Sequence, residues 1–173
     1  MDLIEEAGRL YDYNNIEAPK HGRFASPEAI NEWEQLQARV RQTARELRFR
    51  EIYSNSLMPE KDAELLGELN QMVHTLNPIS RDMTTLRPSL LYGFLKSVSY
   101  NFNRNIKGVR FFETGHVFSK SDNGTYYSNI REESHLLLGV SGFKTIEHWR
   151  TEPELYDLFD LKAPVTTFLS QLG

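Results

Sequence analysis

The most constraining feature of the sequence is the segment 77–118, which joins a turn, a helix start, a long amphipathic helix and a strand. Asn77 and Pro78 end the extended run before them, because proline cannot continue a ladder and disfavours helix in its predecessor. Pro88 suits the first turn of a helix, where an N–H group would have no partner. The helical spacing of six apolar residues then predicts a helix over 88–104 with one broad apolar face: Leu90, Leu91, Phe94, Leu95, Val98 and Phe102.

The run that follows, VRFFETGHVF at 109–118, alternates in the manner of a strand. Alternation places Glu113 on the same side as Val109 and Phe111. A carboxylate on an apolar face needs a partner, because burying an unpaired charge is costly. The polar stretch 119–129 contains Asp122-Asn123-Gly124, which predicts a hairpin turn answered by a strand over 135–140, and hence an antiparallel sheet.

The other elements complete an α+β fold, an antiparallel sheet flanked by helices. We expect an N-terminal helix over about 2–12 and an irregular connection over 13–25. Ser26-Pro27-Glu28 supplies an N-cap, a proline at the first helical position and an acid in the first turn of a helix that runs to about Leu47. Further predictions are strands near 49–54 and 72–76, a short helix near 61–66 and a closing helix over about 163–172.

Composition narrows the class of protein. The chain has 173 residues, 39% of them hydrophobic, which is enough for one packed domain, and no apolar run is long enough to span a bilayer. It has no cysteine, which excludes disulfides and thiolate metal sites, and no secretory leader opens it. We therefore expect a cytoplasmic protein without membrane contact. Of the three parts 1–80, 81–119 and 120–173, only 81–119 has a net positive charge, with six basic and two acidic side chains.

Five blocks, in order along nearly the whole chain, carry a family resemblance. They are Asp2-Leu3-Ile4-Glu5-Glu6, Asn77-Pro78-Ile79-Ser80, Leu86 to Leu91 with Asn103-Arg104, Phe112 to Phe118, and Leu158-Phe159-Asp160-Leu161-Lys162. In this order they resemble the catalytic-like core domain of the beta subunit of bacterial phenylalanine–tRNA ligases, which are class II aminoacyl-tRNA synthetases. The chain departs from the family pattern at Tyr92, Thr114 and Ala163-Pro164, but no block is lost.

The resemblance implies a domain division and a function. Residues 1–25 would be the end of a preceding domain and a linker, and 26–173 a class II synthetase-like core domain truncated at its C-terminus. Such a domain is non-catalytic. It would support ATP-dependent attachment of phenylalanine to tRNA by assembling with the catalytic alpha subunit in an alpha2beta2 heterotetramer. The tRNA would be bound through the holoenzyme, which also uses the ATP. The alternative is a free-standing class II paralogue that acts as a small-molecule-binding or regulatory module.

Asp2, Glu5 and Glu6 form the candidate metal site. Their i, i+3, i+4 spacing places three carboxylates near one helical face, which suits Mg²⁺. Acids in a first helical turn also complement the helix dipole, and the residues alone favour this reading over a metal site. The resemblance implies a Mg²⁺ shared with the alpha subunit and completed by a further upstream acid. That acid is absent from this chain, so we expect weak binding without the partner.

Glu113 with Arg87 and Arg110 could suggest an ATP-binding class II centre, in which an arginine grips phosphate. The sequence has no Gly-rich segment ending in an arginine, so the third class II motif is missing. We therefore read Glu113 as a paired sheet residue, and predict no catalytic or cofactor-binding residue and no activity for this chain alone. The five histidines lack the spacing of a zinc site: His21, His74, His116, His135 and His148.

Between Met83 and Phe112 the chain is basic without any acid, with Tyr100 and Phe102 interleaved: Arg87, Lys96, Arg104, Lys107 and Arg110. This pattern is compatible with nucleic-acid contact, but one basic helix face is more often solvated or complements an acidic partner. The apolar stripe of the 88–104 helix is wider than one sheet face requires. We therefore expect this helix to contribute to an assembly interface.

Overall fold

The computed structural model describes residues 3–17, 31–121, 129–145 and 149–172. The chain divides into two compact units, Met1–Glu32 and Trp33–Gly173. The first unit contains helix α1 (Leu3–Tyr11), which confirms the helix expected over 2–12 and buries none of its residues. A 3-10 turn η1 (Tyr13–Asn15) follows, and the side chain of Asp12 caps it by accepting a hydrogen bond from the Asn14 N–H.

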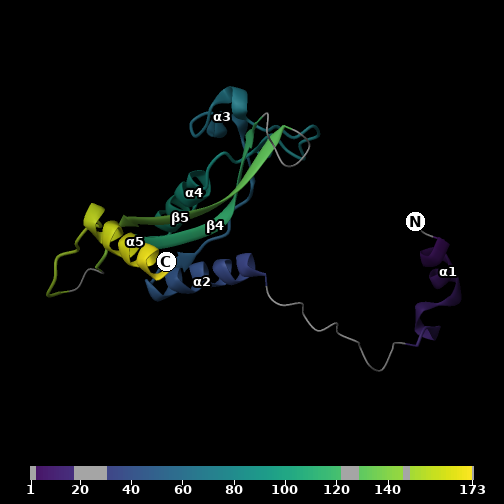
Figure 1. Cartoon of the computed structure of the whole chain (residues 1–173), viewed down its shortest axis with the longest axis horizontal. Helices are drawn as coiled ribbons and strands as arrows, with labels where there is room; N and C mark the ends of the chain where they lie inside the picture. Colours follow the sequence, from purple (N-terminus) through teal and green to yellow (C-terminus); the bar gives the residue numbers. More distant parts are fainter. Residues whose placement is uncertain (1–2, 18–30, 122–128, 146–148, 173) are drawn as a thin grey trace. The chain divides into compact units, whose positions relative to one another are not determined.

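The larger unit is built from three main helices, a three-stranded sheet and a small two-stranded sheet (Figure 1). Its elements in chain order are α2 (Glu32–Glu46), β1 (Arg50–Glu51), β2 (Leu57–Met58), α3 (Glu60–Ala63), η2 (Leu69–Gln71), β3 (Thr85–Leu86), α4 (Leu91–Phe102), β4 (Gly108–Lys120), β5 (Ile130–Gly142) and α5 (Leu158–Leu172). Across the described parts of the chain, no helix has the length and apolarity needed to cross a membrane.

The hairpin of β4 and β5 is the central element of the fold, and it confirms the predicted antiparallel pair. Its register runs from Gly108 opposite Gly142 to Lys120 opposite Ile130. The predicted turn at Asp122-Asn123-Gly124 lies outside the described residues.

The sheet is mixed: the antiparallel pair predicted from the sequence is present, and a further strand pairs with it in parallel. Strand β1 pairs in parallel with β4, with Arg50 opposite Phe111, so the sheet order is β1-β4-β5. Parallel neighbours need a long crossover connection, and the chain between β1 and β4 supplies one that contains α4. Alternation within a strand predicts which face a residue occupies, but not the direction of the neighbouring strand.

The two faces of the sheet hold separate apolar cores, and Figure 1 shows α4 on one side of the hairpin and α2 with α5 on the other. On the α4 side, Phe94 packs with Val109 and Phe111, which confirms the predicted face of β4. On the opposite side, Phe112 packs with Phe49 and with residues of α2 and α5, including Ala44 and Phe168. Each of these residues of β4 therefore packs into the core on the face that alternation along the strand predicts for it.

The strand predicted near 72–76 is wrong. Helix η2 ends just before it, at Gln71, and the stretch itself holds a single bridge, between His74 and Thr85. Two backbone hydrogen bonds flank this bridge, from Leu86 N–H to the Val73 carbonyl and from Thr75 N–H to the Thr84 carbonyl, but β3 is only two residues long, so no longer ladder forms. Met72 and Val73 are both buried, as expected for a packed loop rather than an alternating strand.

Two predicted helix starts are also wrong. Helix α4 begins at Leu91, because the backbone of Arg87 is held extended by hydrogen bonds from Arg87 N–H to the Ser56 carbonyl and from Phe118 N–H to the Arg87 carbonyl. Pro88 therefore lies before the helix. Helix α2 begins at Glu32, and the predicted cap at residues 26–28 lies outside the described residues.

Helix α5 begins at Leu158, five residues before the predicted start, because a capping box forms ahead of it. The Asp157 carboxylate accepts from the N–H groups of Phe159 (2.7 Å) and Asp160 (2.9 Å), while Asp160 accepts from the Asp157 N–H (2.9 Å). This last bond, together with Lys144, lowers the pKa of Asp160. The box begins the helix early enough to place Pro164 in its interior.

We predict that Asp157→Ala destabilises the protein by about 1 kcal/mol, because two N–H groups at the start of α5 lose their acceptor. The measurement is the free energy of unfolding from urea denaturation at neutral pH. Glu152→Ala is the matched control, since it removes an exposed acid nearby that makes no recorded hydrogen bond among the described residues. Equal stability of the two variants would show that the box does not stabilise the helix.

Candidate functional site

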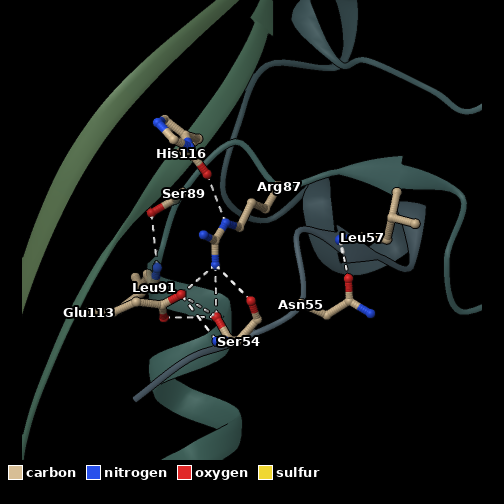
Figure 2. A network of polar contacts seen from close by, with 8 residues as sticks. All are labelled: Ser54, Asn55, Leu57, Arg87, Ser89, Leu91, Glu113 and His116. Carbon is tan, nitrogen blue, oxygen red and sulfur yellow. Dashed lines mark hydrogen bonds and ion pairs between the residues drawn. The ribbon is translucent and has the colours of Figure 1, made fainter. Parts of the chain in front are cut away.

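A buried ion pair between Arg87 and Glu113 occupies the α4 side of the sheet (Figure 2). Arg87 Nη1 donates to Glu113 Oε1 at 2.6 Å, and the two residues are 4% and 0% exposed. Arg87 Nε also donates to the carbonyl of His116 at 2.8 Å. Glu113 was predicted to need a partner on an apolar face, and the structure confirms that it has one.

Ser54 completes the network from the segment after β1. Its hydroxyl lies 2.9 and 2.8 Å from the two carboxylate oxygens of Glu113, and its N–H donates to Oε1 at 3.2 Å. Arg87 Nη1 donates to the same hydroxyl at 2.8 Å. Two glycines provide the space: a Cβ on Gly93 would lie 2.0 Å from Ser54 Oγ, and one on Gly115 would lie 2.2 Å from Arg87 Nη2.

The network is closed on itself, so its chemistry is that of a structural tether. Both carboxylate oxygens of Glu113 already accept hydrogen bonds from within the chain. Arg110, the other arginine considered for an ATP-binding centre, is engaged elsewhere: its Nη2 donates to the Leu47 carbonyl at 2.9 Å, and its guanidinium lies 4.6 Å from the Phe49 ring centroid. The three residues therefore do not form one centre.

The candidate metal ligands belong to the first unit, and the structure describes only two of them. Asp2 lies outside the described residues, and Glu5 and Glu6 are exposed on α1. Glu6 pairs with Arg9 at 2.9 Å. Carboxylate oxygens suit Mg²⁺, but a group of three or more acids or histidines that could hold an ion is not found within the described ranges. The metal site remains a prediction.

The described histidines are exposed and lie beside single carboxylates. His74, His116 and His135 approach Glu60, Glu132 and Glu133 at 3.9, 3.5 and 3.7 Å. His21 and His148 lie outside the described residues.

The basic stretch of the sequence is dispersed by folding. Arg87 is buried in the ion pair, Lys96 lies over the Tyr92 ring, and Arg104 lies 3.4 Å from the Tyr100 ring centroid. Lys107 and Arg110 instead line a cavity of about 600 Å³ together with Arg48 and Arg50. Arg48 and Arg50 were not predicted as site residues. They flank the buried Phe49, and this alternation is a local signal that both arginines lie apart from the core.

Comparison with known proteins places the chain in a family. Residues 23–173 match the family model described as "Phenylalanyl tRNA synthetase beta chain CLM domain". The phenylalanine–tRNA ligase beta subunits of Salinibacter ruber and Chlorobium chlorochromatii are 37% and 34% identical over 99% and 100% of this chain. The chain spans only 22% of the length of each of these relatives.

A solved structure supports the same fold. It is described as an ATP phosphoribosyltransferase regulatory subunit/histidyl-tRNA synthetase from Bacillus halodurans C, and it matches with a TM-score of 0.57 and 14% identity. The match covers 91% of this chain and 40% of that one. At this identity the likeness shows the fold alone, and that fold is the synthetase fold expected from the sequence.

We predict that Arg87→Met lowers the free energy of unfolding by about 3–5 kcal/mol, because it leaves the buried carboxylate of Glu113 without its cation. The measurement is chemical denaturation at neutral pH. Arg131→Met is the matched control: it breaks the exposed pair with Glu133 and should cost about 0–1 kcal/mol.

If Arg87→Met does not fold, adding Glu113→Gln should recover part of the lost stability by removing the unpaired charge. A loss for Arg87→Met no larger than that for Arg131→Met would contradict the tethering role.

Proposed function

Because this chain belongs to the family of phenylalanyl-tRNA synthetase beta chains, we propose that it is a non-catalytic, synthetase-like domain that supports attachment of phenylalanine to tRNA. In this proposal it assembles with a catalytic alpha subunit in an alpha2beta2 heterotetramer, and tRNA and ATP are handled by the whole assembly. The observation that carries the proposal is the family match over residues 23–173. The closed Arg87–Glu113 network supports it, because a carboxylate engaged on both oxygens is suited to holding the fold rather than to gripping a substrate.

Helix α4 supports an assembly role. Of the six apolar residues predicted for this helix, Leu90, which directly precedes α4, and Phe94 are buried, at 3% and 8% exposed. Leu91, Leu95 and Phe102 are 39%, 52% and 41% exposed. These three follow one another by four and seven residues, so they share one helical face, which we call the outer stripe. An apolar stripe open to water favours a protein partner.

We extend the proposal to Mg²⁺. Glu5 and Glu6 supply hard oxygen donors, and Asp2 would add a third one turn earlier. Glu6 would have to leave Arg9 to bind the ion. Such a site gains from a partner that brings further oxygens and excludes water, which is the role proposed for the alpha subunit.

We expect the chain to bind Mg²⁺ at roughly millimolar levels or more weakly when alone, and more tightly in the assembly. Titration calorimetry with and without the alpha subunit measures this. Glu5→Ala should remove the gain, whereas Glu64→Ala, which removes another exposed acid, should not. Micromolar affinity of the chain alone, unchanged by Glu5→Ala, would contradict the shared site.

We predict that replacing any residue of the outer stripe by Ala weakens association with the alpha subunit by about one to two orders of magnitude. The basis is that burial of one such side chain contributes about 1.5–3 kcal/mol. Association is measured by titrating the alpha subunit, and the melting temperature of each free variant should stay close to that of the parent.

The matched control is Phe94→Ala on the inner side of the same helix, which should cost about 3–5 kcal/mol of folding stability. Phenylalanine-dependent exchange between pyrophosphate and ATP, measured in parallel, should appear only when the alpha subunit is present. If the stripe variants lose stability like Phe94→Ala and assemble normally, helix α4 is core and the interface lies elsewhere.

A further inference from the structure

A cavity of about 280 Å³ lies on the α2 side of the sheet, beside the part of β4 that runs beyond its pairing with β1. Its walls come from α2, from the segment between β1 and β2, and from β4 and β5. Four of the lining residues form two facing pairs of the hairpin, namely Thr114 with Leu136 and His116 with Ser134. The volume is near the lower end of the range for small-molecule sites, roughly 300–1,000 Å³, so it suits a ligand with a single ring.

The walls of the cavity are largely apolar and aromatic. Leu36, Val40 and the ring of Trp33 line it from α2, and Leu136 lines it from β5. Tyr53 also lines the cavity and is 95% exposed, so its ring lies at the rim. Aromatic and aliphatic side chains gain most from a flat ring that covers them. The walls therefore favour an aromatic ligand.

The walls carry no net charge. Each of the four basic side chains that line the cavity lies beside one acid: the pairs are Arg41–Glu51, Arg87–Glu113, His116–Glu132 and His135–Glu133. No acidic side chain lines the cavity itself among the residues that the structure describes. A charged ligand would lose its hydration here without gaining an unpaired counter-charge. An uncharged ligand is therefore favoured.

A buried arginine offers the cavity one unused hydrogen-bond donor. Arg87 lines the cavity and makes its hydrogen bonds through Nε and Nη1, whereas Nη2 donates to no acceptor in the described part of the chain (Figure 2). Nη2 packs over Gly115, where a Cβ would clash with it. Among the buried atoms of these walls, only Thr114 Oγ1 lacks a partner in the described residues, so Nη2 is open to solvent. Such a donor is suited to a ligand, because buried polar groups are nearly always bonded.

The backbone of Thr114 adds a donor and an acceptor close to this arginine. The Phe112 carbonyl accepts from the Ile52 N–H, on the side of β4 away from β5. The His116 carbonyl accepts from Arg87 Nε on that side as well. Alternation along the strand places the N–H and carbonyl of Thr114 on the same edge. Neither group has a backbone partner outside the hairpin within the described ranges, so the edge is open at this residue.

We propose that this cavity binds a small uncharged ligand with one aromatic ring and an amide group. The ring lies against the apolar walls, the amide oxygen accepts from Arg87 Nη2, and the amide N–H donates to the Thr114 carbonyl. An amide supplies a donor and an acceptor without charge, as these walls require. Amino acids and nucleotides are charged, so the same argument disfavours them. This role goes beyond the support of the alpha subunit proposed above and does not depend on it.

The test uses the protein in the longest form that its gene encodes, with benzamide as the probe and calorimetry as the measurement. Three further probes keep the ring and change the head group: toluene has no polar head, benzoate is an anion and benzylamine is a cation. Benzamide should bind at least about tenfold more tightly than each of them, because only benzamide makes both hydrogen bonds without carrying charge.

Two variants locate the site. Leu136→Ala removes part of a wall, and Tyr53→Ala removes the ring at the rim. Each should weaken benzamide binding by about threefold to tenfold, because apolar contact with the ligand is lost. The melting temperature of Tyr53→Ala should stay close to that of the parent, since this side chain is almost fully exposed. A loss of binding in this variant is therefore not caused by unfolding.

Leu169→Ala is the matched control, because it removes the same side chain as Leu136→Ala from an exposed position on α5 that does not line the cavity. It should leave benzamide binding unchanged. The proposal is overturned if benzamide does not bind, or if toluene, benzoate or benzylamine binds as tightly. It is also overturned if Leu169→Ala weakens binding as much as Leu136→Ala and Tyr53→Ala do.

Discussion

The buried pair of Arg87 and Glu113 is the interaction on which the larger unit depends. It joins three segments that are distant in sequence: the residues after β1, the end of β3 and the middle of β4. The Arg87 backbone adds bonds to the Ser56 carbonyl and from the Phe118 N–H, so the small β2–β3 sheet is fixed to the main sheet at the same point. Helix α4 begins four residues later, after the segment that these backbone bonds hold extended.

Local patterns predicted the parts of the fold that depend on local chemistry. The β4–β5 hairpin was predicted from a turn signal between two strands, and the inward face of β4 follows from alternation, which is why Val109 and Phe111 were placed correctly. The parallel pairing of β1 was not predictable, because it depends on a crossover more than fifty residues long. The start of α5 was placed at about residue 163, whereas the reciprocal bonds of Asp157 and Asp160 begin the helix at Leu158.

The candidate sites show the same difference between features that local sequence predicts and features that depend on long-range contacts. The sequence established that Glu113 needs a partner, since burial of a lone carboxylate is costly whatever the fold. It could not identify Ser54, whose approach depends on how two sheets meet. The basic stretch was visible as a run along the chain, yet folding separated its members and brought Lys107 and Arg110 to Arg48 and Arg50 instead. A run of basic residues in the sequence predicts a basic surface patch only where its members lie on the same surface of the fold.

The close approach of Ser54 to Gly93 has a consequence for how this domain can vary. Gly93 lies within the first turn of α4, where alanine would favour the helix by about 1 kcal/mol. The helix forgoes that gain because the space of one methyl group is occupied by the Ser54 hydroxyl. Local helix preference and long-range charge pairing therefore oppose each other at this residue. Substitution by residues of higher helix propensity is therefore tolerated on the outer face of α4 but not at Gly93.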